Sequence, residues 1–430
     1  MAFPSNVRLE DNQIGQERKE NSMRGSKRFW QIFWTILGFI FLVGCAAPAH
    51  TTAGSIPTPP GIPDTLPPPP TTPQPPPSPM ATAEPTGVAS LFKLIRTVEV
   101  VPDDLYKNGA FTRTYFVPQT GRMVVTFGGQ LLEPAGGCTE AGHGYKEYTP
   151  EMEPTGKSGV LNCEMADLGS TMVDNFFYDV SMHGEGDSIG WRIMKYNAVS
   201  WEILADVYFP LDMPKEANAD PMVAFVNGML DVSSGYYETG EPSMGLGEGT
   251  HHQLFTPDLK FIEEKMLKDP PHIHGASMIY VDGVYYLITA TAYDGDVIVM
   301  KYDKDWKYLG KQDLIRMAHF STGVAFDGRR FYVAYTDTSQ RTNPPDFFPV
   351  YLNIHLAVFD REWNLVGDLA VTDFAPADNQ GPARPSVTLH ENRVYVSYDL
   401  EAPKGDEELE GFAAGKAMVN VYELSQQPGG

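Results

Sequence analysis

Five residues whose side chains could bind a charged ligand precede runs of strand-forming residues, although they lie far apart along the chain. They are Arg113, Asp220, His274, His319 and Arg384. Two guanidinium groups at one site would hold a carboxylate or a sulfate in bidentate fashion, which suits an acidic sugar. The alternative is that these side chains pair with one another and act as structural contacts.

Imidazole groups offer a second chemistry, because neutral histidine binds Zn, Cu or Ni. The candidate ligands are His272, His274 and His319, and the other histidines form no recognisable ligand set. A calcium site is a further alternative, either at Asp294-Gly295-Asp296 or among the glycines between Gly240 and Gly249. We otherwise expect no cofactor.

Motifs of several common enzyme classes are missing from the sequence. It has no His-Glu-x-x-His and no dinucleotide-binding fingerprint between a strand and a helix. Glycoside hydrolysis of the usual kind needs two carboxylates at a defined separation. Acids are available at Asp174, Asp220 and Glu248, but their spacing singles out no pair. This favours a binding protein over an enzyme.

The elements that would position these residues are strands. Beyond residue 90 the chain consists of short runs rich in Val, Tyr, Phe, Ile and Met, separated by Gly, Asp, Asn and Pro. Two runs, Met278–Ile288 and Val324–Ala334, each contain a central Asp-Gly pair, the strongest short signal for a β-hairpin. We therefore expect an all-β domain.

A second pattern follows the hairpins and repeats along the chain. An aromatic residue is followed, after three or four positions, by a tryptophan or another large apolar residue, and the copies begin 47 to 63 residues apart. Such a period is typical of four-stranded repeat units. The copies are Tyr148…Met152, Tyr196…Trp201, Phe255…Leu259, Tyr302…Trp306, Phe359…Trp363 and a truncated one at Tyr422.

The repeats predict a six-bladed β-propeller, with five or seven blades as alternatives. Blades should start near residues 111, 169, 220, 274, 319 and 384. The innermost strand of each blade begins at the central channel, so the five candidate ligand-binding residues should converge there. The repeated tryptophans should pack between blades, and stacking on a ligand is the alternative role.

The ends of the domain predict how the propeller closes. The last copy stops at Val419–Leu424 without a fourth strand, and Leu91–Val101 precedes the first copy as an isolated strand. Propellers commonly let one terminus complete the blade that the other begins, which removes free strand edges. We expect Leu91–Val101 to be the outer strand of the last blade.

Single blades resemble a known group of propellers. The stretch Gly275–Thr291, with its Asp282-Gly283 hairpin, loosely resembles a blade of arabinanase-like and sialidase-like glycoside hydrolases, as does Asp220-Pro221 before a strand. The resemblance implies a propeller fold and a glycosidase or polysaccharide lyase as the alternative function. The sequence departs from these enzymes, because it lacks the Ser-x-Asp-x-Gly-x-x-Trp box and three carboxylates at successive blade starts.

The N-terminal region indicates export. Arg24, Lys27 and Arg28 precede the apolar stretch Phe29–Phe41, and Leu42-Val43-Gly44-Cys45 follows. This resembles the lipobox of bacterial lipoproteins, in which the cysteine is acylated, for example with palmitate, and becomes the mature N-terminus. A transmembrane helix is the alternative, but the stretch is short against the ~20 residues that a span needs.

The resemblance implies three segments. Residues 1–44 are a signal segment whose true start is Met23, unless residues 1–22 form a longer cytoplasmic extension. Residues 45–90 are the lipidated cysteine and a Pro-rich spacer, and residues 91–427 are the propeller. The domain then faces outward from the cell membrane or outer membrane, where Cys138 and Cys163 should form a disulfide, with a metal pair as the alternative.

Charge limits the partners. The formal net charge of -23 argues against nucleic acid, because phosphate binding needs concentrated Lys and Arg. Three functions remain: a module that binds a carbohydrate or protein, a glycosidase or lyase, and a structural component of an envelope complex. The last predicts an exposed apolar patch on a blade.

Overall fold

The computed structural model describes residues 91–164, 168–185, 188–211, 221–236, 246–247, 249–267, 272–273, 277–291, 295–339, 353–375, 381–401 and 415–425. Residues 85–430 form one compact unit and residues 1–84 another. The predicted signal segment, Cys45 and the predicted Pro-rich spacer lie outside the described residues.

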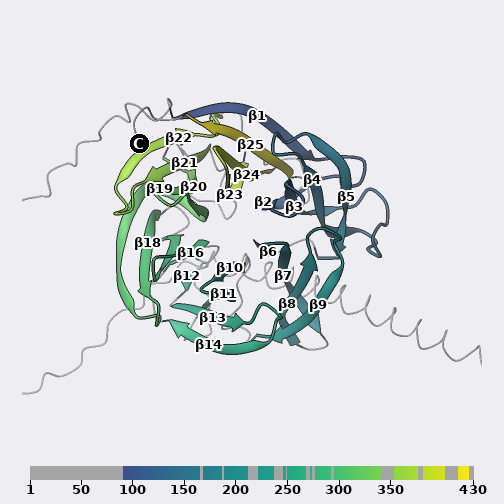
Figure 1. Cartoon of the computed structure of the whole chain (residues 1–430), viewed down its shortest axis with the longest axis horizontal. Coiled ribbons are helices and arrows are strands. Elements are labelled where there is room, and N and C mark those ends of the chain that lie inside the picture. The colour runs from purple at the N-terminus through teal and green to yellow at the C-terminus, as the bar shows by residue number, and fades with distance from the viewer. Residues whose placement is uncertain are drawn as a thin grey trace, which may run out of the picture. The chain divides into compact units, whose positions relative to one another are not determined.

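The described chain is all-β and forms a six-bladed propeller, as predicted (Figure 1). Each blade is an antiparallel meander whose first strand lies innermost. The first three blades are β2(Ala110–Val117)-β3(Arg122–Gln130)-β4(Ala141–Tyr148)-β5(Pro154–Asn162), β6(Leu168–Val173)-β7(Phe176–Glu185)-β8(Ser188–Asn197)-β9(Ile203–Pro210) and β10(Met222–Val226)-β11(Met229–Tyr236)-β13(Gly249–Phe255)-β14(Phe261–Leu267).

The fourth and fifth blades share one long strand, β19(Tyr308–Phe326), and so form a single seven-stranded sheet. Its first part pairs with β18 and closes the fourth blade, and its last part pairs with β20 and opens the fifth. The other strands are β16(Ser277–Val281), β17(Val284–Ala290), β18(Gly295–Asp303), β20(Phe331–Asp337), β21(Asn353–Phe359) and β22(Leu365–Ala370). A small separate sheet pairs β12(Leu246–Gly247) with β15(His272–Ile273).

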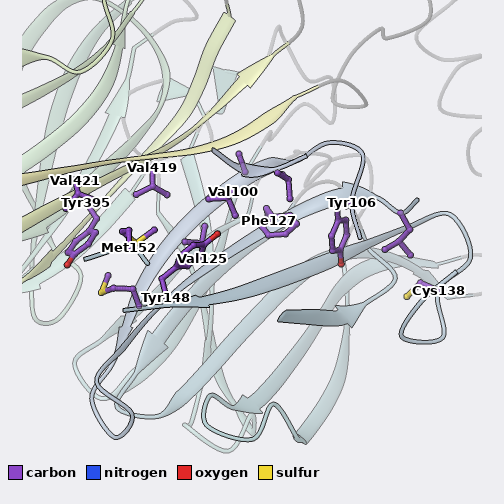
Figure 2. Close-up of a cluster of buried hydrophobic side chains, with 14 residues drawn as sticks. Val100, Tyr106, Val125, Phe127, Cys138, Tyr148, Met152, Tyr395, Val419 and Val421 are labelled. Carbon is purple, nitrogen blue, oxygen red and sulfur yellow. The ribbon is translucent and has the colours of Figure 1, made fainter. Parts of the chain in front are cut away.

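The sixth blade contains both ends of the domain. Strands β23(Gly381–His390), β24(Arg393–Glu401) and β25(Lys416–Leu424) are completed by β1(Phe92–Val101), which pairs antiparallel with β25. The predicted closure by the N-terminal strand is therefore confirmed. Figure 2 shows the apolar cluster between this blade and the first, where Val419 and Val421 lie near Val125 and Met152.

The repeated aromatic and tryptophan pattern marks the turn between the third and fourth strands. Its second residue has a positive φ, from 58° to 65°, at Met152, Trp201, Leu259, Trp306 and Trp363. Non-glycine residues rarely adopt this left-handed conformation. Here it turns the side chain into the space between blades.

The tryptophans pack against aromatic rings as predicted. Trp306 stacks on Tyr285 at 4.1 Å, and Trp363 stacks on Phe331 at 4.1 Å. Trp201 of the second blade stacks on Tyr145 of the first at 4.0 Å. Trp306 also lies 4.5 Å from the His252 ring of the third blade, and Trp363 lies 5.4 Å from the Tyr286 ring of the fourth. The tryptophans therefore contact the neighbouring blades.

The two predicted hairpins differ in their turns. Asp282 and Gly283 have φ of 52° and 84° and form a two-residue turn between β16 and β17. Phe326 instead pairs with Phe331, so that the loop from Asp327 to Arg330 has four residues. The second hairpin is confirmed, but its turn is longer than a bare Asp-Gly pair.

The predicted disulfide is present. Cys138 and Cys163 are bonded, with their Cα atoms 5.2 Å apart. Cys163 directly follows β5, and Cys138 lies between β3 and β4. The bond therefore joins two segments of the first blade, and the alternative of a metal pair is excluded.

Candidate functional site

The two ends of the propeller differ in their connections. The connections between the first and second strands and between the third and fourth strands of the blades lie at one end, here called the turn end. Each of these connections contains two to five residues. The first residues of the innermost strands lie at the opposite end, here called the loop end, together with longer connections. Fifteen residues separate β20 from β21 there, and fourteen separate β24 from β25. Binding residues are commonly carried by such connections on a rigid scaffold.

Arg113 lies at the loop end, near the start of β2. Its side chain is partly exposed, and Nη1 donates hydrogen bonds to the carbonyl oxygens of Thr112, at 3.0 Å, and Arg384, at 3.1 Å. Arg113 thus contacts the backbone of the neighbouring blade. The two predicted arginines are indeed brought together.

Arg384 is buried, whereas Arg113 is partly exposed. It is only 5% exposed, its Nη1 lies 3.2 Å from Oδ2 of Asp399, and its guanidinium lies over the Phe111 ring at 4.7 Å. Asp399 is fully buried and also accepts hydrogen bonds from the Phe111 and Thr112 amides. The Arg384 side chain is therefore part of the buried interface between the sixth and first blades.

From the sequence, Arg113 and Arg384 are expected at equivalent positions of their innermost strands, but strand register shows that the two positions differ. In β2 the paired residues advance by three, from Ala110 to Arg113, while the partner strand advances by two. The same shift occurs in β23 between Ala383 and Ser386. Each shift is a bulge, which inserts an extra residue into one strand. Arg384 is therefore equivalent to Phe111, and both have a positive φ, of 48° and 57°.

The other three predicted residues cannot be placed in a site. Asp220 and His274 lie outside the described residues, and His319 is described only by its backbone in β19. His272 likewise lies in β15 without a described side chain. The calcium and histidine-metal hypotheses fall mainly on these segments. Within the described part of the chain, no group of three His, Cys, Asp or Glu side chains could hold a metal ion.

Asp174, a candidate acid, lies at the wrong end for the predicted site. It occupies the turn between β6 and β7 with a φ of 52° and is exposed at the turn end. It is therefore remote in topology from the starts of the innermost strands.

Buried acid groups on second strands were not predicted. Asp179 in β7 is 1% exposed, and its Oδ2 lies 2.8 Å from Nδ1 of His143 and 2.6 Å from Nδ2 of Asn162. Both partners belong to the first blade, so the carboxylate joins two blades. An acidic residue inside an otherwise apolar strand, Phe176–Val180, was the available signal.

A serine, a histidine and an aspartate also meet in the third blade. Oδ2 of Asp231 and the hydroxyl of Ser233 both lie 2.9 Å from Nδ1 of His252, and the Asp231 and His252 side chains are at most 1% exposed. In a hydrolase triad the serine and the aspartate contact opposite ring nitrogens. Here they share one nitrogen, and the His252 ring lies against Trp306 at 4.5 Å. The trio is a packed polar group, without the geometry of a nucleophile.

One further serine motif has the wrong context. Gly186-Asp187-Ser188-Ile189-Gly190 matches the spacing of the nucleophile elbow. That elbow needs a strand followed by a helix. Ser188 instead begins strand β8, and the element before it is strand β7.

The fifth blade holds a titratable cluster near the loop end. Nδ1 of His355 lies 3.1 Å from Oδ2 of Asp368, and the Tyr335 hydroxyl donates to the same oxygen at 2.8 Å. Burial alone would lower the pKa of His355, but the hydrogen bond and charge of Asp368, with the charge of Asp337, raise it overall. Burial raises the pKa of Tyr335 well above its ordinary value.

No helix in the described residues is long and apolar enough to cross a membrane.

The known proteins to which this chain is similar share little of its sequence. No family model matches the chain, and no curated protein matches it. Among solved structures, a subtype N10 neuraminidase-like protein of A/little yellow-shouldered bat/Guatemala/060/2010 is similar with a TM-score of 0.46 and 11% identity, over 78% of this chain and 99% of that one. A neuraminidase-like protein from A/bat/Guatemala/164/2009 is similar with a TM-score of 0.44 and 9% identity, over 78% and 96%.

Proposed function

We propose that the chain is a lipid-anchored, extracytoplasmic binding module whose loop end recognises an acidic carbohydrate. The observation that carries the proposal is the position of Arg113. It is a partly exposed cation at the start of an innermost strand, in a domain of strongly negative charge. A carboxylate or sulfate at this end could pair with the Arg113 guanidinium.

The anchor is proposed from the Leu42-Val43-Gly44-Cys45 motif and the Pro-rich spacer. A spacer of this composition extends by ~3.1 Å per residue in polyproline II. It would link the propeller to the acylated cysteine without fixing the distance between the propeller and the lipid headgroups. The disulfide supports an oxidising compartment on the outer side of the membrane.

The burial of three acidic side chains favours a binding function over hydrolysis. Asp179, Asp231 and Asp399 are at most 1% exposed, and each accepts hydrogen bonds from neighbouring side chains or amides. A catalytic carboxylate must reach the glycosidic bond or its attacking water. These three acids instead hold the blades together.

The test uses residues 85–430, which form a compact unit with a closed ring of blades. Binding to an array of acidic and neutral glycans is measured for this domain and for two variants. Arg113→Ala removes the proposed cation. Arg329→Ala is the matched control, because Arg329 is exposed in a hairpin at the turn end.

We expect carboxylated or sulfated glycans to bind, with a loss of roughly tenfold or more in Arg113→Ala, which corresponds to one charged hydrogen bond. Arg329→Ala should bind like the unchanged domain. Equal binding by both variants, or no glycan bound at all, would overturn the proposal and direct the search to protein ligands. Melting temperatures of both variants establish that the fold is retained.

A further inference from the structure

Exposed apolar side chains are concentrated at one place in five of the six blades. In the described residues, twelve large apolar side chains are between 39% and 54% exposed, and ten of them form five pairs of consecutive residues. Isolated exposed residues of this kind are ordinary on protein surfaces, whereas a recurring group indicates a contact surface. The pairs are Leu94–Ile95, Ile203–Leu204, Phe261–Ile262, Tyr308–Leu309 and Leu365–Val366.

Strand register places all five pairs at the same position. The first member of each pair lies opposite the aromatic residue that ends the repeated third strand, for example Tyr308 opposite Tyr302 and Leu94 opposite Tyr422. In the first blade this position holds Pro154, opposite Tyr148, and Thr155 follows. The pairs therefore form a ring, here called the apolar ring, which five blades carry and the first blade interrupts.

Packing inside the propeller does not account for the apolar ring. The aromatic residues opposite the pairs, such as Tyr302 and Phe359, are at most 4% exposed, whereas Leu309 and Leu365 are 54% and 53% exposed. The pairs start the outermost strands, which lie at the periphery in Figure 1, next to the turn end. The second residue of each pair is the extra residue of a β-bulge, where the regular alternation of side chains between the two faces is interrupted.

The distribution of the apolar ring favours a broad surface as its partner. A second propeller placed side by side would cover one or two pairs and leave the others exposed. A continuous layer beneath the turn end can contact pairs of several blades together. The chain enters the propeller at this edge, because Leu94 follows the first described residue, Leu91, by three positions.

Basic residues flank three of the five pairs, although the domain is acidic and exposed glutamates, Glu202 and Glu263, adjoin two of the pairs. Residues 1–84 contain six basic and six acidic residues, so the whole net charge of -23 belongs to residues 85–430. Exposed lysines nevertheless border the ring at Lys93, Lys260, Lys307 and Lys311. Such side chains lay their apolar stems on a hydrophobic surface while the ammonium groups reach water or phosphate.

We propose that the apolar ring docks the propeller onto a phospholipid surface with the turn end toward the lipid. Phospholipid headgroups supply phosphates for the flanking lysines, and the boundary of the acyl chains accepts the apolar pairs. The loop end then faces away from the membrane. The inference goes beyond the proposed function, which supplies only the anchor that brings this surface near.

The turns at the same end determine which lipid is preferred. They carry aspartates that include Asp282, Asp305 and Asp360. Repulsion between these carboxylates and anionic headgroups should make neutral phosphatidylcholine vesicles a better partner than phosphatidylglycerol vesicles.

The test uses residues 85–430, without the anchor, in sedimentation with phosphatidylcholine vesicles. In one variant Tyr308, Leu309, Leu365 and Val366 are all replaced by Ser. The matched control is Leu132→Ser, because Leu132 is 46% exposed but lies in a connection at the loop end. All replaced side chains are exposed, so the melting temperature should stay within a few degrees of the unchanged domain.

We expect the unchanged domain and the control to sediment with vesicles, and the four-site variant to partition at least tenfold less. The proposal is overturned if the unchanged domain stays in the supernatant, or if the control loses as much as the variant. Self-association that the four-site variant abolishes would make a second copy the occupant, which also overturns it. Glycan binding is measured without lipid, so the two proposals fail separately.

Discussion

The carboxylate of Asp399 accepts a 2.6 Å hydrogen bond from the hydroxyl of Thr112, which joins the sixth blade to the first. The same carboxylate accepts the amides of Phe111 and Thr112 and pairs with the buried Arg384. This joint lies where the ring of blades must close. A buried charge with several partners therefore stabilises the closure in addition to the pairing of β1 with β25.

Replacing Asp399 by Ala should lower the free energy of unfolding by about 3–5 kcal/mol, because Arg384 would remain buried without its partner. Urea denaturation of residues 85–430 measures the loss. Asp305→Ala is the control, since the Asp305 side chain is 73% exposed in a turn, and its effect should stay below about 0.5 kcal/mol. Equal effects of the two substitutions would contradict the structural role of Asp399.

The positive φ of Trp363 predicts that, at this position, a glycine variant is at least as stable as an alanine variant. Trp363→Ala should cost about 3–5 kcal/mol through lost packing, because the side chain is 2% exposed. Trp363→Gly should be no less stable than the alanine variant, because glycine adopts a φ of 65° without the ~1 kcal/mol that alanine pays.

Trp191 provides the matched control for this order. It is fully buried in the strand β8 and is not among the residues with positive φ. There glycine should be the less stable replacement, since it weakens a strand interior. The same order of alanine and glycine at both positions would show that backbone conformation does not matter at Trp363.

Loss of the disulfide should destabilise the domain by ~3 kcal/mol in the chain-entropy model, since Cys138 and Cys163 are 25 residues apart. Thermal melting with and without reductant measures the effect. The variant with both cysteines changed to Ser is the control, because residues 85–430 contain no other cysteine. Its melting temperature should not respond to reductant, and a response would place the effect elsewhere.

His355 should make stability depend on pH. Its folded pKa is raised, so its protonated form contributes stability that is fully present below the ordinary pKa of about 6.5 and is lost as pH rises through the raised value. The difference in melting temperature between the unchanged domain and His355→Gln should therefore be larger at pH 5.5 than at pH 8.5.

His390 should give the opposite dependence of stability on pH. Its pKa is lowered by burial and by the charge of Arg393, against the charge of Glu391. Its contribution should be present above the ordinary pKa and lost as pH falls. The His390→Gln difference should thus change with pH in the opposite direction to that of His355→Gln, and parallel trends would refute both assignments.

The repeat pattern predicted most of the fold because the same residue types are needed at the same turn of each blade. The large side chain that follows Phe359 or Tyr302 contacts a ring of the neighbouring blade, and the same residue type recurs at each copy. The truncated copy at Tyr422 lacks a fourth strand, and the isolated strand at Leu91–Val101 can supply it. Closure of the propeller could therefore be predicted too.

The candidate site was less predictable, because bulges change register without a sequence signal. The extra residues at Phe111 and Arg384 shift the side chains that follow, and counting from a hairpin does not detect them. Burial of Arg384 against Asp399 depends on a partner in another strand, which no local pattern specifies. Asp179 and Asp231 were overlooked for the same reason, although an acid within an apolar strand is a usable signal.

The central claim, recognition at the loop end, is tested most directly by amide hydrogen exchange of residues 85–430 with and without a bound acidic glycan. The account predicts added protection near Thr112 and Arg113 in β2 and near Arg384 in β23, with turns such as Asp282–Gly283 unchanged. Protection confined to turn-end segments, with exchange near Arg113 unaltered, would contradict it.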